Sequence, residues 1–152
     1  MPHLASRGVL FVLAAFIAVT AIAGALFVVP GLPPEWIDGG PFADYTVPAV
    51  TLGFVGVLAV MTMLALVIRP DIAGAAAVTA GAAMVAFELV EIGVVGFSLL
   101  EYGVGEPVAW LQVVYVAIGL ITTGMGGALW VATADDRRRR DRTSAHAAPH
   151  SI

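Results

Sequence analysis

Two carboxylates, Glu88 and Glu91, are the residues of this chain whose position most strongly suggests chemistry. They lie inside one of four long apolar stretches, and a charged side chain within a membrane-spanning segment is costly and is by default a functional hypothesis. Their spacing of three residues places them on one face of a helix. Counted from Asp71, they lie about 25 and 30 Å along the helix axis. Both therefore belong to the outer part of a bilayer core about 30 Å thick.

A second polar pair, Gln112 and Tyr115, lies near the start of the next apolar stretch, again with a spacing of three residues. If the two stretches are antiparallel neighbours, the two pairs face each other. The amide of Gln112 can donate two hydrogen bonds and the Tyr115 hydroxyl one, which suits a carboxylate near lipid. We expect Asp44, Tyr45 and Trp36 of a preceding loop to lie at the same end, so the sequence predicts a shallow polar pocket there.

Three interpretations of this pocket stay open. In the first, Glu88 and Glu91 bind a proton, a cation or an amine, and the chain is a small transport or binding component. In the second, they form a static hydrogen-bonded cluster with Gln112 and Tyr115 that fixes helix packing. The chain is then a non-transporting accessory or scaffold subunit of a membrane complex. In the third, the helix tilts so that one glutamate reaches the headgroups.

The elements that must position these residues are four apolar stretches, each long enough to cross a bilayer as a helix. They run about 8–29, 46–68, 72–100 and 107–134. Hydrophobic residues make up 60% of the 152-residue chain and charged residues 12%, the latter about half the usual share. The sequence therefore predicts an all-α bundle of four transmembrane helices in residues 1–134. The polar tail, 135–152, is predicted to be disordered.

The first stretch has an alternative interpretation as a cleaved signal peptide, with Ala21-Ile22-Ala23 as the cleavage site. The apolar run continues to Val29, which favours a retained helix, and both alternatives stay open. The third stretch begins with small residues, which let helices approach closely in lipid and so predict a packed helix face. These are Ala73, Gly74, Ala75, Ala76, Ala77, Ala80, Gly81, Ala82 and Ala83.

The basic residues predict the orientation. All seven are arginines, and in a four-helix topology all seven fall on one side, which positive-inside bias places in the cytoplasm. Both termini are thus expected to be cytoplasmic in a multi-pass protein of the cell membrane. Besides Arg7 and Arg69, the tail supplies a basic anchor that is a candidate for contact with anionic lipid. Its members are Arg137, Arg138, Arg139, Arg140 and Arg142.

Several chemistries are disfavoured by composition. The chain has no cysteine, hence no thiolate nucleophile or thiolate metal site, and its three histidines lie outside the apolar stretches. No phosphate-binding loop or dinucleotide fingerprint is present. We therefore expect a non-enzymatic protein with no cofactor, no metal and no nucleic-acid partner. Its expected surroundings are the lipid bilayer and either further copies of itself or a larger membrane complex.

Three short motifs carry a family resemblance. Residues 40–48 read GPFADYTVP, residues 91–93 read EIG, and residues 110–120 read WLQVVYVAIGL. Their order resembles SPF-x-D-[FY]-x-x-PG, Q-x-x-M-I-G and WLQ-x-x-Y-x-x-x-GL, a pattern of small uncharacterised prokaryotic four-helix membrane proteins. The chain departs from it in Ala49, and in Glu88 and Glu91, where the pattern has Gln and Met. The resemblance covers about 40–120; it implies the four-helix architecture and no activity.

Overall fold

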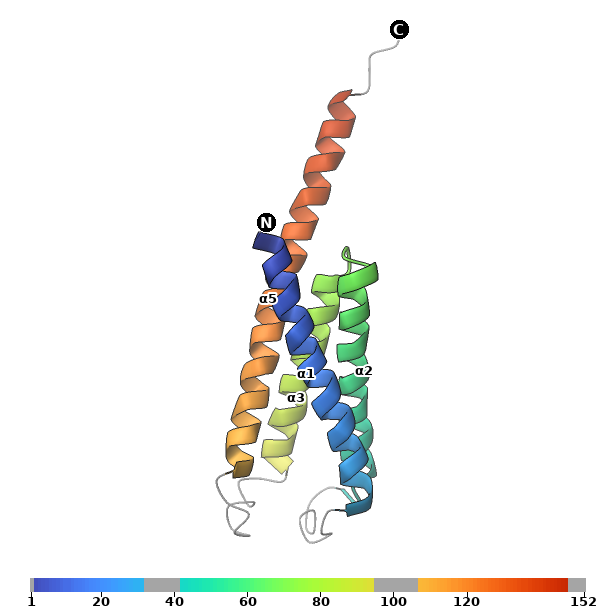
Figure 1. Ribbon diagram of the computed structural model, residues 1–152, viewed down its shortest axis with the longest axis vertical. Helices are drawn as coiled ribbons and strands as arrows, with labels where there is room; N and C mark the ends of the chain where they lie inside the picture. The colour runs from blue at the N-terminus through green and yellow to red at the C-terminus, as the bar shows by residue number, and fades with distance from the viewer. Residues whose placement is uncertain (1, 32–41, 95–106, 148–152) are drawn as a thin grey trace.

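A computed structural model describes residues 2–31, 42–94 and 107–147 of the chain. Within them the fold is all-α (Figure 1), with the helices α1 (Pro2–Gly31), α2 (Thr46–Ile68), α3 (Ala73–Val94) and α5 (Pro107–Ala147). Each of these four helices contains a segment of 21 to 30 residues that is long and apolar enough to cross a membrane. The predicted all-α class with four membrane-length helices is confirmed. This is the architecture of a multi-pass membrane protein.

The helix bounds agree with the sequence most closely for α2, which covers the predicted 46–68. Helix α1 begins before and ends after the predicted 8–29. Helix α3 begins at Ala73, and the part of the predicted 72–100 that follows Val94 lies mostly outside the described residues.

The tail differs from the sequence expectation. Helix α5 continues to Ala147, although residues 135–152 were predicted to be disordered. Alanine and arginine are strong helix formers, and Asp135 and Asp136 precede Arg139 and Arg140 by four residues, the spacing of favourable helix pairs. Residues 135–147 also contain no glycine or proline and extend a helix that has already nucleated, so no new nucleation is needed.

The helices pack as two antiparallel pairs. Helix α3 makes its most extensive contacts with α5, and α1 with α2, while α2 and α3 join the pairs. Figure 1 shows α1 crossing the other helices diagonally, with its start beside α5 and its end beside α2. The start of α1 and the projecting part of α5 lie at the same end of the bundle.

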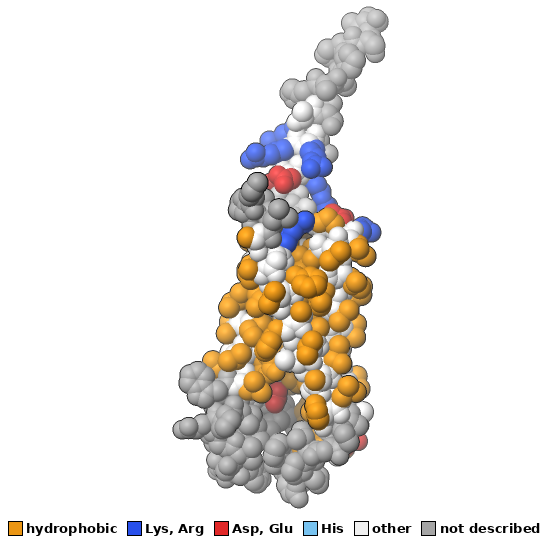
Figure 2. All heavy atoms as spheres, in the orientation of Figure 1, with side chains coloured by type: hydrophobic (Ala, Val, Ile, Leu, Met, Phe, Trp, Pro, Cys, Tyr) orange, Lys and Arg blue, Asp and Glu red, His pale blue; other side chains and the backbone are white. Residues whose placement is uncertain are grey.

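Small and apolar side chains fill the interior, whereas large apolar side chains cover the outside. The buried core centres on Leu10, Ile17, Val55 and Met84, with alanines between them. Outward-facing apolar residues such as Phe27, which is 77% exposed, are numerous, and hydrophobic side chains cover much of the visible face between the two ends, a zone called here the hydrophobic belt (Figure 2). Exposure of so much apolar surface to water would be unfavourable, whereas contact with the hydrocarbon of a bilayer is favourable. The helix surfaces are therefore consistent with contact to a lipid bilayer.

Glycines set the distance between α3 and α5. A Cβ added to Gly81 would lie 2.6 Å from the carbonyl oxygen of Gly119, and one added to Gly74 would lie 2.8 Å from that of Gly126. Gly74 and Gly81 are seven residues apart on α3, and their partners Gly126 and Gly119 are seven residues apart on α5 in the opposite direction. The close contact therefore repeats after two helical turns. The packed small-residue face predicted for the start of α3 is present, with Ala73, Gly74, Ala77, Ala80 and Gly81 all buried.

Polar contacts fix the end of the bundle where α2 turns into α3. Arg69 and Asp71 form a two-pronged ion pair, with Nε–Oδ1 and Nη2–Oδ2 distances of 3.2 and 3.3 Å. Arg137 of α5 donates from Nη2 to the backbone oxygen of Asp71 at 2.6 Å. The hydrogen bond from Arg69 is the main reason that the pKa of Asp71 lies below its usual value. This turn therefore ties α5 to the α2–α3 connection.

The glycine contact leads to a matched pair of substitutions. We expect Gly81→Ala to lower the melting temperature in detergent, because the new methyl group meets the backbone of α5 and overpacking costs about 1–3 kcal/mol. Gly124 lies on α5 with nothing within 4 Å of an added Cβ. Gly124→Ala should therefore be neutral or stabilising, since alanine is the better helix former. Equal melting temperatures for the two variants would contradict the close α3–α5 contact.

Candidate functional site

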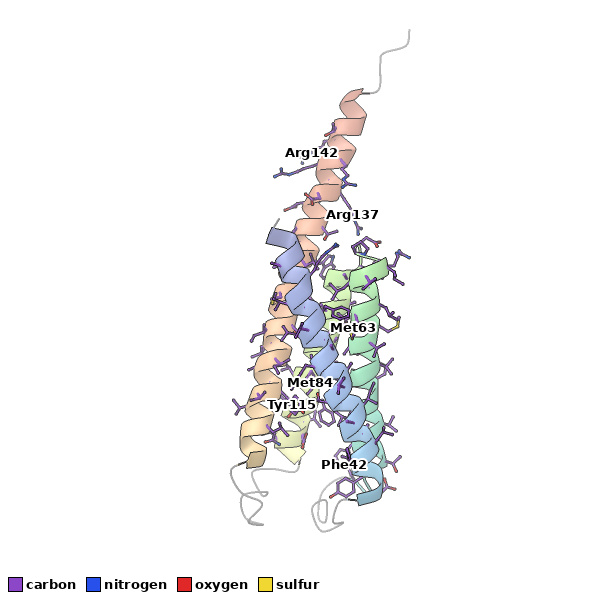
Figure 3. All side chains as sticks on the ribbon, in the orientation of Figure 1. Phe42, Met63, Met84, Tyr115, Arg137 and Arg142 are labelled. Carbon is purple, nitrogen blue, oxygen red and sulfur yellow. The ribbon has the colours of Figure 1, made fainter. Side chains whose placement is uncertain are left out.

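The structure brings the four predicted site residues into one cavity. Glu88 and Glu91 reach it from α3, and Gln112 and Tyr115 from α5. The cavity has a volume of about 180 Å³ and lies in the half of the bundle opposite the projecting end of α5. Figure 3 shows Met84 and Tyr115 in this half, among the helices rather than on the outer surface. The predicted meeting of the two polar pairs is thus present in the structure.

Glu88 is the most deeply placed of the four. Its side chain is only 3% exposed, which is exceptional for a glutamate. Its Oε2 atom is fully buried and has no hydrogen-bond partner among the described residues. Glu91 follows three residues later, about one helical turn along the same face of α3, and lines the same cavity. Glu88 therefore faces the interior of the bundle and does not reach a lipid-facing surface.

The residues of α5 complete the polar side of the cavity. Gln112 lies near the carboxyl group of Glu91 in the same cavity. The buried Nε2 atom of Gln112 nevertheless completes no hydrogen bond with a described residue. An unpaired acceptor on α3 and an unpaired donor on α5 thus line the same cavity. Such unsatisfied groups are rare in folded proteins and call for an explanation, for which a bound ligand is one candidate.

The remaining walls are mostly apolar. Met84 and Phe87 come from α3 and Leu52 from α2. The ring of Tyr115 packs against Phe16 of α1, with centroids 6.0 Å apart and planes tilted by 39°. A cation or a small amphipathic molecule would therefore meet carboxylates on one side and hydrocarbon or aromatic surface on the other.

Helix α1 contributes residues that the sequence argument missed. Thr20 and Gly24 line the cavity, one turn apart on α1. A Cβ on Gly24 would lie 2.8 Å from Cδ2 of Leu52, so glycine lets α1 approach α2 here. The only sequence feature that could have indicated their place in the site is a polar residue and a glycine four positions apart in the first span. That feature is weak, because the hydroxyl of a threonine in a helix usually donates a hydrogen bond to a backbone carbonyl of the same helix. Thr20 does so, since its hydroxyl donates to the Phe16 carbonyl at 2.8 Å.

The loop residues expected near the pocket do not line it in the described part of the structure. Asp44 is exposed, and Tyr45 is not among the lining residues. Asp44 instead accepts a hydrogen bond from the backbone nitrogen of Thr46 at 2.8 Å, at the start of α2. This bond lowers the pKa of Asp44. Trp36 lies outside the described residues.

The arginines gather at the opposite end. Figure 2 shows the visible basic side chains at one end of the molecule, at the edge of the hydrophobic belt and along the projecting part of α5. Arg137 points to the α2–α3 turn, whereas Arg142 lies farther along the projection (Figure 3). Arg138, Arg139, Arg140 and Arg142 are exposed. The described arginines are thus confined to one end, whereas acidic residues lie at both ends: Asp44, Glu88 and Glu91 at the cavity end, and Asp71, Asp135 and Asp136 beside the arginines.

Fold and site together define a small protein of four helices that are long and apolar enough to cross a membrane, with a carboxylate-lined cavity between them. No family model, curated protein or solved structure matches the chain. The functional argument therefore depends on the geometry of the pocket alone. Among the described residues, no group of three or more histidine, cysteine, aspartate or glutamate side chains converges in a way that could hold a metal ion.

The unpaired oxygen of Glu88 predicts an unusual stability effect. Glu88→Met should raise the melting temperature of the ligand-free protein in detergent, because it removes a buried polar group whose desolvation costs about 1–3 kcal/mol. Leu89→Met, on the exposed neighbouring position, serves as a control and should change little. A clear loss of stability in Glu88→Met alone would show that the carboxyl group holds the helices together.

Proposed function

We propose that this chain is a non-enzymatic membrane protein that binds a small cation or a proton between Glu88 and Glu91, as a transport or binding component. The observation that carries the proposal is the buried Oε2 atom of Glu88, which lacks a partner and faces a cavity shared with a second carboxylate. Two neighbouring carboxylates without a counter-charge are unfavourable unless a proton or a cation joins them. No arginine, lysine or histidine is among the described lining residues.

The cavity walls favour an organic ammonium ion as the cation. The Phe87 and Tyr115 rings can attract a cation through their faces, and Met84 and Leu52 accommodate alkyl groups. A volume of about 180 Å³ has room for a small alkylammonium ion. A strongly hydrated metal ion would need more oxygen ligands than two carboxylates provide.

The same protein would lie in the cell membrane with both termini in the cytoplasm. The support is the segregation of charge: the described arginines are at the end where α1 starts and α5 projects, and positive residues remain on the cytoplasmic side. In this orientation the pocket lies in the exterior half of the bilayer. A ligand would reach it from outside the cell.

The orientation can be measured with single cysteines, since the chain has none of its own. A membrane-impermeant maleimide added to intact cells should label Asp44→Cys, at the pocket end. Arg142→Cys should be labelled only after the membrane is opened. Both positions are exposed on the protein surface, so whether each cysteine reacts depends on which side of the membrane it lies. Labelling of Arg142→Cys alone in intact cells would reverse the orientation.

The binding proposal is tested by calorimetry with ethylammonium chloride, using sodium chloride at equal ionic strength as the reference. We expect saturable binding whose apparent affinity rises with pH, because only the ionised carboxylates pair with the cation. Tyr115 is the other titratable group among the described lining residues. Glu88→Gln should weaken binding about tenfold or more, the loss expected for one charge-assisted interaction.

Asp44→Asn provides the matched control, because Asp44 is an exposed carboxylate at the same end but outside the cavity. It should leave the affinity for ethylammonium unchanged. If Asp44→Asn and Glu88→Gln weaken binding equally, the effect is a general surface charge effect and the pocket is not the binding site.

The alternative function is that of an accessory or scaffold subunit of a membrane complex, in which Glu88 and Glu91 are structural. The position of the site favours this alternative in one respect, since Glu88 and Gln112 each lie seven residues, about two helical turns, beyond the close contact between Gly81 and Gly119. This alternative predicts no binding of ethylammonium and a loss of stability when Glu88 is replaced by an apolar residue.

A further inference from the structure

A second cavity lies at the opposite end of the molecule, and the carboxylate pocket does not account for it. It has a volume of about 350 Å³ and is bordered by the start of α1, the α2–α3 turn and the middle of α5. Three arginines line it, Arg7 from α1 and Arg137 and Arg140 from α5. We call this cavity the arginine cleft.

The acidic residues in the arginine cleft do not balance its arginines. Asp71 and Asp136 also line it, but Asp71 is already paired with Arg69 at 3.2 Å and lies 3.9 Å from Arg137. By formal charge, the three arginines that line the cleft exceed the two aspartates that line it. Arg7 has no ion pair or hydrogen bond with any described residue, although it is partly buried. The cleft is thus electropositive.

The chemistry and depth of the cleft point to a phosphate group. A guanidinium carries five N–H donors in a planar fork that matches phosphate oxygens. Arg137 uses its Nη2 atom on Asp71, which leaves other donors of that side chain available. Arginines from two different helices converge on the cleft, so it can hold an anion from more than one side.

The apolar part of the lining favours a lipid as the source of the phosphate. Leu129, Ala132 and Pro70 line the cleft beside the arginines. The arginines at this end lie where the apolar outer surface gives way to charged side chains (Figure 2). In a bilayer this is the level expected for lipid headgroups. Basic pockets between helices at this level are suited to anionic headgroups.

We propose that the arginine cleft binds the phosphate of an anionic phospholipid headgroup, with Arg7 and Arg140 closing on it from α1 and α5. This inference is independent of the function of the carboxylate pocket. Bound lipid would join the start of α1 to α5, two elements that otherwise share few contacts.

The test uses the full chain in a neutral detergent and follows its melting temperature as short-chain phosphatidylglycerol is added. We expect a saturable rise with phosphatidylglycerol and none with phosphatidylcholine of the same chain length. Arg7→Gln and Arg140→Gln should each raise the half-saturating concentration about tenfold. Arg138→Gln removes the same charge from an exposed position of the basic anchor that lies outside the cleft. The cleft proposal expects this variant to leave that concentration unchanged, whereas a general basic anchor would make it act like Arg7→Gln.

Inorganic phosphate distinguishes the source of the group. If it reproduces the rise and Arg7→Gln abolishes its effect, the cleft binds phosphate and the ligand is a free anion. If only phosphatidylglycerol acts, the ligand is the lipid. Should Arg7→Gln unfold the protein, Arg7→Lys, which keeps the charge but loses the fork, is expected to weaken binding severalfold. An equal effect of Arg138→Gln and Arg7→Gln, or of the two lipids, would overturn the proposal.

Discussion

The close contact between α3 and α5 is the constraint on which the rest of the structure depends. In lipid, helices gain little from hiding apolar surface, so association relies on close packing. Gly81 and Gly119 let the two backbones approach, and Gly74 and Gly126 repeat the contact two turns away. This sets an antiparallel register. Followed in one direction it brings Glu88 beside Gln112, and in the other it brings Asp71 beside Arg137.

One register thus organises two ends of opposite chemistry. At one end the helices enclose carboxylates without a counter-charge; at the other, arginines outnumber aspartates. A bilayer makes this segregation meaningful, because charged side chains are tolerated at its core only when they bind or pair with something. In a bilayer the arginine end would have water and headgroups for partners. At the other end Glu88 is buried among the helices, and its Oε2 atom has no hydrogen-bond partner among the described residues. The unfavourable burial of Glu88 is what a binding function would explain.

Much of this arrangement was readable from the sequence because membranes impose strong rules. Apolar length predicted four helices. The three-residue spacing placed each polar pair on one helix face, and an antiparallel arrangement of the third and fourth helices predicted that Glu88 and Gln112 share a site. Other features depended on tertiary geometry. Thr20 and Gly24 line the cavity because α1 crosses the other helices diagonally. No local sequence pattern predicts this crossing. The helical tail was missed because its polarity suggested disorder, whereas an existing helix and residues such as Arg139 favour continuation.

The central claim is that Glu88 and Glu91 exchange protons and cations within the cavity. Infrared difference spectroscopy of the purified protein between about pH 5 and 9 observes the carboxyl groups themselves. The account predicts a carboxylic acid band that disappears as pH rises, is lost in Glu88→Gln, and converts to carboxylate at lower pH when ethylammonium is present. If the ligand is a proton alone, the titration remains and ethylammonium has no effect on it. A carboxyl spectrum that is identical in wild type and Glu88→Gln at every pH would contradict the claim.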